Sequence, residues 1–488
     1  MKLILFFLTL LFSTNLYSEI VILKDGRKID LKDDGTFTII SDGEKNISNI
    51  QQTIISLLQL SDFDFEYELL DQENSIILKN LEWIDQGELH SIEVIEIFNL
   101  NEKYFDNFNI NSFNKYRGKI FDKLIIDNWQ VDSSTEKFSI EYIEVINLDH
   151  LKINELNIND FDDENYLSIL DGLVVDKIFF LNAFADDGEE IIQFSGIINN
   201  IKDLKIGIIQ FDDLFFRDSE FDAKVAQFKI EDFKLNKSTI EKIDWDNPTE
   251  DDYLEIFDSL GNVEMSNGEF IYNDNNDLKI KFSKIQFGNF KMEYINEILF
   301  PTKGIIELIG LEIDSNDAAY DQIKEVIGSD QIKFNTLLNW DWNNINDKLN
   351  TSLSFVLQNL FELDINSTFS NNESFELNSN IENSEVKLNE FSINLNNYGL
   401  IENMYELLSS QQNISASEYV SNLIFQLQLF AIDTYIGEES FNELKTFLQN
   451  PQNLNISIQP FPPLSFVQIY NLFNNPDILI ELLNIKVE

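Results

Sequence analysis

Few residue types in this 488-residue sequence could carry conventional catalysis. The chain has no cysteine and only two histidines, His90 and His150. A serine–histidine–carboxylate triad would need one of these two histidines, and no G-x-S-x-G elbow accompanies either. Phosphate-binding loops, dinucleotide fingerprints and H-E-x-x-H motifs are also absent from the sequence. We therefore predict a protein that is not an enzyme, with no catalytic residue and no cofactor, and we expect both histidines to be polar surface residues.

Carboxylates are the most abundant reactive groups, with 86 Asp and Glu residues. A glycosidase-like site requires two carboxylates at a fixed separation, and so many candidates single out none. Two denser acidic clusters occupy residues 160–164 and 274–277. Calcium prefers six to eight oxygen ligands in a shaped loop, and neither cluster has EF-hand spacing. We interpret both clusters as solvated turns and predict no metal site, with a carboxylate-dependent hydrolase as the minor alternative.

Two tryptophans could form a binding platform of another kind. Trp340 and Trp342 alternate with Asp341, so in a strand both indoles would lie on one face. Such a pair could stack on a sugar ring. Packing in the core or at its rim is the more common role of large aromatic side chains, and we favour it here.

The net charge of −52 limits the classes of partner. A strongly acidic surface repels phosphate backbones, so we predict no nucleic-acid binding. Arginine, which recognises anions through two parallel hydrogen bonds, occurs only at positions 27, 117 and 217. We interpret the acidity mainly as a means of staying soluble, with binding of cations or of a basic partner as the alternative.

The N-terminus predicts export. Lys2 precedes an apolar run from Leu3 to Phe12, and a more polar stretch leads to a plausible cleavage point before Glu19. A membrane anchor would need about 20 apolar residues, so residues 1–18 indicate a signal peptide, and we predict no transmembrane helix after its cleavage. The mature protein would be periplasmic or secreted. Residues 19–45 then predict a small β-meander, because two Asp-Gly turns separate short alternating strands.

The region from residue 46 to 397 predicts a repeat-built β structure. Segment 91–100 matches segment 139–148 at most positions, and segment 166–173 similarly matches segment 253–260. Acidic residues precede both members of the second pair, which favours the start of a short helix there. The repeated unit would thus contain strands with short intervening helices.

Apolar residues in these strands follow an unusual spacing, in which steps of three and two residues alternate. Val225, Phe228, Ile230, Phe233 and Leu235 show this pattern. It fits neither a helix face nor simple alternation, because each three-residue step would move the side chain to the other face of a strand. A bulge at each such step restores one apolar face, so we predict bulged antiparallel strands. A pentapeptide β-helix is the alternative, which the bulky residues at both inward positions disfavour.

The apolar side of these strands is the candidate binding surface. The sequence leaves open whether it forms a closed core or an open groove. The residues that would line a groove are Phe228, Ile230, Phe233, Leu235, Phe282, Phe287 and Phe290.

Residues 398–488 change to helical spacing and end in a short strand. Segments 400–408, 419–436 and 440–448 are predicted helices, and we expect the apolar segment 416–436 to be buried against the sheet. The fold class is therefore mainly β with α (α+β), with a helical C-terminal region.

Strands of the form F-x-I-x-x-F-x-L, such as Phe228 to Leu235, follow an export segment and alternate with predicted helices. This layout, over roughly residues 90–400, resembles AsmA-like β-rich envelope proteins of Gram-negative bacteria. The resemblance implies a periplasmic role in lipid or outer-membrane homeostasis, although this chain is more acidic and, with its signal peptide cleaved as predicted, would lack a lasting anchor. The leading hypothesis is an exported, non-enzymatic protein that binds lipid or an envelope protein along an apolar β face. The alternative is a secreted or surface adhesin-like repeat scaffold, and the sequence does not indicate an oligomeric state.

Overall fold

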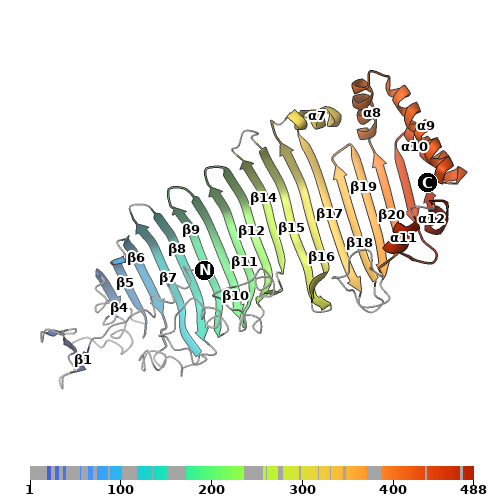
Figure 1. Ribbon diagram of the computed structural model, residues 1–488. Helices are drawn as coiled ribbons and strands as arrows, with labels where there is room; N and C mark the ends of the chain where they lie inside the picture. Colours follow the sequence, from blue (N-terminus) through green and yellow to red (C-terminus); the bar gives the residue numbers. More distant parts are fainter. Residues whose placement is uncertain are drawn as a thin grey trace. The chain divides into compact units, whose positions relative to one another are not determined.

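The computed structural model divides into two compact units, which we describe separately (Figure 1). Unit 1 comprises residues 1–218 and 231–257, and unit 2 comprises residues 219–230 and 258–488. The structure describes residues 19–22, 28–31, 37–39, 55, 64–69, 74–85, 88–101, 118–133, 136–150, 172–235, 257–259, 261–272, 278–295, 298–316, 318–329, 331–343, 348–370, 386–434, 437–472 and 476–488. The predicted signal peptide and both acidic clusters lie outside these residues.

Unit 1 contains two antiparallel sheets. The first pairs β1 (Glu19–Ile22) with β2 (Lys28–Leu31), and β2 with β3 (Phe37–Ile39). In the second sheet each strand pairs with the next one along the chain. Its strands are β4 (Asp64–Leu69), β5 (Ile76–Asp85), β6 (Glu88–Phe98), β7 (Gly118–Asp132), β8 (Lys137–His150), β9 (Leu173–Asp186), β10 (Ile191–Lys202) and β11 (Lys205–Arg217).

Unit 2 is also built on antiparallel strands joined mostly in chain order. The division between the units falls within β12 (Phe221–Leu235). The other strands are β13 (Phe257–Ser259), β14 (Asn262–Tyr272), β15 (Leu278–Ile295), β16 (Ile298–Asp314), β17 (Ile332–Asn343), β18 (Lys348–Leu357), β19 (Phe361–Ser370), β20 (Lys387–Asn397), β21 (Asn453–Ile458), β22 (Leu464–Ser465) and β23 (Ile485–Val487).

The described helices belong to unit 2. They are α7 (Ala318–Ile327), α8 (Leu400–Gln411), α9 (Ala416–Thr434), α10 (Glu438–Gln449), α11 (Phe466–Leu472) and α12 (Pro476–Leu483). Helix α9 packs mainly on α8, α10 and α12, whereas α10 contacts β21 and β23. None of the helices in the described part of the chain is long and apolar enough to span a bilayer.

The prediction of a mainly β, antiparallel protein with a few short helices is confirmed. Two expectations about helices are wrong. Residues 257–259, within a segment predicted as a short helix, form β13. Helix α9 is not buried against the sheet, because Phe425 is 60% exposed and Leu429 is 48% exposed. Apolar content suggested burial for α9, but its neighbours are other helices and its outer side faces solvent.

The three-residue steps take a specific form in unit 1. In β7 the apolar residues Leu124, Ile126 and Trp129 lie on one face, and Asn128 occupies the step between the last two with a φ of 49°. Asparagine is one of the few residues with a side chain that adopts this left-handed conformation readily. The left-handed backbone of Asn128 thus accommodates the extra residue of the three-residue step, and the next apolar side chain lies on the same face again.

These asparagines align across neighbouring strands. The register places Asn80, Glu93, Asn128, Glu141 and Asn182 opposite one another, from β5 to β9. Each of the three asparagines has a positive φ. The side-chain amide of Asn128 donates to the Glu93 carboxylate, and that of Asn182 donates to the Glu141 carboxylate, each at a distance of 2.5 Å. We call this set the first Asn–acid row.

A second Asn–acid row runs parallel to the first. It contains Asn99, Asp122, Asn147 and Asp176, and it continues to Asn200 in β10. The side-chain amide of Asn99 donates to Asp122, and that of Asn147 donates to Asp176, each at a distance of 2.6 Å. Because adjacent strands carry their three-residue steps at matching positions, the ladder keeps its register across both rows.

The apolar face of the large unit 1 sheet is buried. Ile76, Ile92, Ile126 and Ile140 are each at most 2% exposed. They belong to one cluster of buried side chains drawn from β5 to β10, and Ile55, which precedes the sheet, is part of it. Unit 1 therefore buries the apolar residues of β5 to β9 on this face, whereas β10 and β11 contribute half-buried ones such as Ile198 and Ile206.

The opposite face of unit 1 is polar and carries ion pairs. The Glu144 carboxylate in β8 accepts from Lys123 in β7 at 2.8 Å and from Lys177 in β9 at 2.9 Å, and its side chain is 14% exposed. The hydrogen bonds from Lys123 and Lys177 lower the pKa of Glu144 below its ordinary value, against the effect of burial. Glu144 thus links three strands through its ionised form.

We expect Glu144→Gln to lower the melting temperature at neutral pH. A carboxylate whose pKa is depressed by folding contributes stability above its unfolded pKa of about 4.3, and this stability is lost as the pH falls through the lower folded value. The gap between the melting temperatures of wild type and variant should therefore begin to narrow as the pH falls below about 4.3 and should close only below the lower folded pKa. Calorimetric scans from pH 3 to pH 8 measure this difference, and a constant gap at all pH values would show that the ion pairs are not its source.

Candidate functional site

The apolar face of unit 2 differs from that of unit 1 in exposure. The register places apolar side chains opposite one another from β14 to β23. The central row consists of Val263, Phe287, Ile306, Leu338, Leu353, Ile365, Ile393, Ile456 and Val487. Eight strand-to-strand steps of about 4.8 Å make this row about 38 Å long. All members except Val487 are half-buried, neither covered nor freely exposed.

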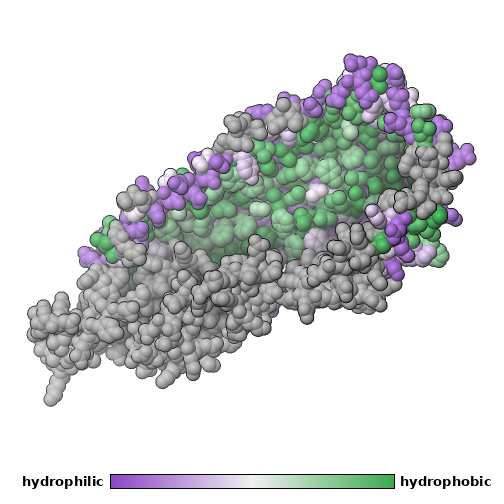
Figure 2. Space-filling view, in the orientation of Figure 1, coloured by the Kyte–Doolittle hydropathy of each residue, from purple (hydrophilic) through white to green (hydrophobic). Residues whose placement is uncertain are grey.

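A second apolar row lies next to the central one. It contains Met265, Ile285, Leu308, Phe355, Leu363, Leu395 and Leu454, interrupted at β17 by Thr336. These residues are half-buried as well. Together the two rows form what we call the unit 2 face, and Figure 2 shows hydrophobic residues gathered over β15 to β20.

The other side of the same strands is polar. Leu337 and Leu338 illustrate the change of face, since Leu337 pairs with Ser354 whereas Leu338 pairs with Leu353. Lys284 of β15 contacts Glu307 of β16 at 3.0 Å on this polar side. The sheet of unit 2 therefore has one charged face and one apolar face, and the described helices pack on one another and on β21 to β23 rather than across the apolar rows.

The unit 2 face contains few polar atoms, and those given by the structure are satisfied. The hydroxyls of Thr351 and Ser367 lie opposite each other on β18 and β19 and form a hydrogen bond of 2.5 Å. The hydroxyl of Thr336 donates to the backbone oxygen of Ser354. The surface thus presents methyl, methylene and ring groups to whatever lies above it.

Aromatic rings pack over the glycines of this face. Gly268 pairs with Phe282, and Gly304 pairs with Trp340. A Cβ atom added at either glycine would overlap the ring of its partner. Each glycine therefore makes room for a ring to lie over the backbone.

The predicted groove residues do not form one group. Phe282, Phe287 and Phe290 lie on the unit 2 face, where Phe282 is only 3% exposed and the Phe290 ring is 5.6 Å from that of Trp340. Phe228 and Ile230 are half-buried residues of unit 2. Phe233 and Leu235 are equally half-buried but belong to unit 1.

Sequence reasoning missed most of the unit 2 face because it followed the three-two spacing. Strands β18 and β19 alternate simply, as Leu349, Leu353 and Phe355 show. Period-two alternation of this kind is the ordinary signal for a strand with one apolar side, so it was available in the sequence. Trp340 and Trp342 lie on the apolar side, and Asp341 lies opposite and reaches Lys303 at 4.0 Å.

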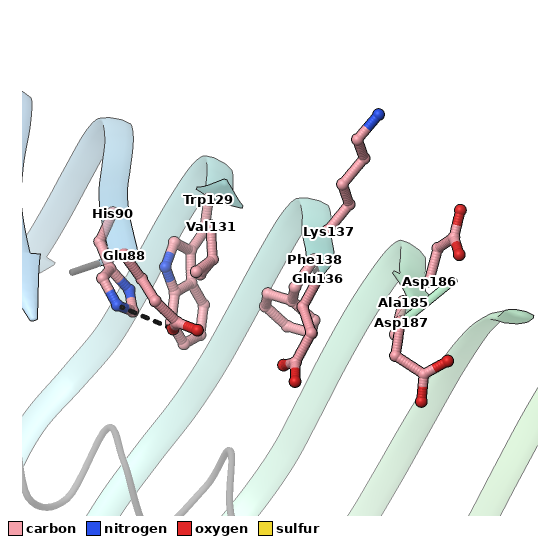
Figure 3. Close-up of a pocket in the computed structure, with 10 residues that line it drawn as sticks. All are labelled: Glu88, His90, Trp129, Val131, Glu136, Lys137, Phe138, Ala185, Asp186 and Asp187. Atoms are coloured by element: carbon pink, nitrogen blue, oxygen red, sulfur yellow. Dashed lines mark ion pairs between the residues drawn. The ribbon is translucent and has the colours of Figure 1, made fainter. Parts of the chain in front are cut away.

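Unit 1 contains a pocket where β6, β7, β8 and β9 approach their hairpins (Figure 3). Its volume is about 400 Å³. Its walls are largely apolar and come from Trp129, Val131, Phe138, Ala185 and His90. Acidic residues stand at its rim, namely Glu88, Glu136, Asp186 and Asp187.

The prediction of a polar surface histidine is wrong for His90. This residue is 6% exposed, its ring stacks on Trp83 with centroids 4.7 Å apart, and its Nε2 is 3.9 Å from Glu88. It occupies an inward position because it pairs with Trp83 and Val131 in the apolar row. His150 is the last residue of β8, and its side chain is not among those described. Among the described residues, no three carboxylate or histidine side chains gather as metal ligands would.

Comparison with known proteins gives one partial match. A family model described only as an uncharacterized protein matches residues 349–488, which begin in β18 and include β19 to β23 and α8 to α12. None of the curated proteins matches the chain.

Proposed function

We propose that this is an exported, non-enzymatic envelope protein that binds the acyl chains of lipids along the unit 2 face. The observation that carries the proposal is the half-buried apolar surface formed by two rows of side chains from β14 to β21. Contiguous apolar patches larger than a few hundred Å² are rare on soluble monomers and mark binding surfaces when they occur.

The shape and chemistry of the unit 2 face favour a chain-like apolar ligand. The central row is about 38 Å long, counted in strand spacings, which exceeds the length of an extended acyl chain. Its hydroxyls bond to each other or to the backbone, so few directional groups are left to select a polar molecule. An acyl chain needs none, because burial of apolar area is its main source of affinity.

A role in the envelope of a Gram-negative bacterium agrees with the resemblance to AsmA-like proteins and with the predicted signal peptide. A protein partner with an apolar surface is the second candidate for the same face. Lipid is favoured because the charged groups that usually fix the register of a protein interface are on the opposite side, as with Lys284 and Glu307.

The test compares two adjacent positions of β18. Leu353 points to the unit 2 face, and Ser354 points to the polar face. The full chain is purified from a bacterial host, extracted with organic solvent and analysed by lipid mass spectrometry. We expect lipid in the wild type, a severalfold loss in Leu353→Asp, and no loss in Ser354→Asp, which carries the same added charge.

A milder variant guards against misfolding. Leu353→Ser should keep the circular-dichroism spectrum of the wild type and still bind less of a fluorescent fatty acid. The proposal is wrong if the wild type neither carries lipid nor binds the fatty acid, or if the Leu353 and Ser354 variants behave alike while folded.

A further inference from the structure

The pocket of unit 1 combines apolar walls with a rim of one charge. Trp129 and Phe138 meet edge to face, with ring centroids 5.2 Å apart and an interplanar angle of 77°. Val131 and Ala185 complete an aliphatic side. A cavity of about 400 Å³ holds a small organic molecule rather than a bare ion.

The hairpins order the rim and hold two of its carboxylates directly. The backbone N–H of Glu136 bonds to the Ser133 hydroxyl at 2.8 Å, which orients the start of β8. Asp186 accepts from the backbone N–H of Gly188 at 2.9 Å. Asp187 accepts from the backbone N–H of Glu190 at 2.7 Å, and this bond lowers the pKa of Asp187, which is therefore ionised at neutral pH.

The rim has one basic residue, and it does not neutralise the opening. Figure 3 shows the Lys137 side chain, and with it that of its register partner Asp186, extending away from the side on which Trp129, Phe138 and Glu136 lie. The charge that faces the opening therefore comes from Glu88, Glu136 and Asp187. Glu88 lies beside His90 at the other end of the same group. A molecule in the pocket would thus meet negative charge at its rim and rings and methyl groups along its body.

We infer that this pocket binds a small organic cation with an apolar body, such as an aromatic or alkyl ammonium compound. The ammonium group gains from the carboxylates and from the aromatic faces, both of which attract cations. The apolar body gains from burial against the walls. The inference is independent of lipid binding by unit 2.

Other occupants fit the pocket less well. An anion would be repelled by the rim and by the net charge of −52. A metal ion needs several oxygen ligands at short range, and the described carboxylates do not gather in that way. A neutral apolar molecule would leave the charge at the rim unused.

The experiment uses three probes that share a benzyl group. Benzyltrimethylammonium, benzyl alcohol and phenylacetate carry positive, zero and negative charge. Titration calorimetry on the full chain should show saturable binding of the cation only. We expect it to weaken about tenfold when 0.5 M salt screens the rim.

Three variants distinguish a built site from general attraction to an acidic protein. The double variant Glu88→Gln/Glu136→Gln should weaken cation binding about tenfold, as expected when two partly exposed charges contribute about 0.7 kcal/mol each. Ala185→Leu, which fills the pocket, should abolish it. Glu189→Gln removes a charge from the β9–β10 hairpin, which carries Asp187, at a residue that does not line the pocket, and it should change binding less than about twofold.

Several results would overturn the inference. These are equal binding of the three probes, no saturable binding of the cation up to about 10 mM, or equal weakening by Glu189→Gln and the double variant. The folded variant Leu353→Asp should bind the cation as the wild type does, so failure of the lipid proposal would not affect this result.

Discussion

Ile126→Ala lowers the free energy of unfolding of unit 1 by about 2–5 kcal/mol, the expected cost of removing a fully buried aliphatic side chain and leaving a cavity. Ile126 is 1% exposed and lies in the buried cluster between β6 and β8. Leu353→Ala, on the half-buried unit 2 face, should cost much less, because less area is lost and no closed cavity forms. Urea melts followed by circular dichroism measure both changes.

The contrast between these two positions separates a closed core from an open surface. A loss at Leu353 as large as that at Ile126 would mean that another layer covers the unit 2 face. Addition of a fatty acid should raise the midpoint of the unit 2 transition in the wild type, because a ligand that binds only the folded state stabilises it. The same addition should shift Leu353→Ala less and Ile126→Ala as much as the wild type.

Gly268→Ala should destabilise unit 2 by about 1–3 kcal/mol, the usual cost of overpacking a filled site. The added methyl group would overlap the Phe282 ring, which is 3% exposed and lies directly over the glycine. This cost is unusual for the substitution, since Gly→Ala at an unstrained position commonly stabilises by about 0.4–1 kcal/mol.

A double-mutant cycle tests this explanation. In the background of Phe282→Ala the space above Gly268 is empty, so Gly268→Ala should be neutral or stabilising, and the coupling energy should be about 1–3 kcal/mol. Gly437→Ala is the control, because a methyl group there would meet nothing within 4 Å. Additive costs for Gly268 and Phe282 would show that the ring does not rest on the glycine.

Local patterns in the sequence predicted the strands well because each pattern is compatible with few backbone geometries. The alternation of three- and two-residue steps can keep one apolar face only if the extra residue is absorbed, and Asn128 and Asn147 absorb it with a left-handed backbone. Helical spacing likewise marked the segments that form α8, α9 and α10. The short helix predicted around residues 253–260 rested on acidic capping alone, and residues 257–259 are in a strand.

Features that depend on distant parts of the chain were not predictable. His90 lies two residues before the buried Ile92, so strand alternation places it on the same face. Its burial also requires Trp83 and Val131 on the neighbouring strands, and this pairing could not be read from the sequence around His90. How deeply each apolar face is buried also depends on distant parts of the chain. Ile126 and Leu353 occupy similar patterns, yet Ile126 is 1% exposed and Leu353 is half-buried.

The Asn–acid rows constrain how such a sheet can change its length. In β7 to β9 an apolar residue recurs after one three-residue and one two-residue step, so the pattern repeats every five residues, as from Phe121 to Ile126. Insertion of a single residue would turn every side chain beyond it to the other face of the strand. It would also move Asn128 away from its position opposite Glu93 and Glu141. Insertions and deletions should therefore survive in these strands only as five-residue blocks, made together in neighbouring strands.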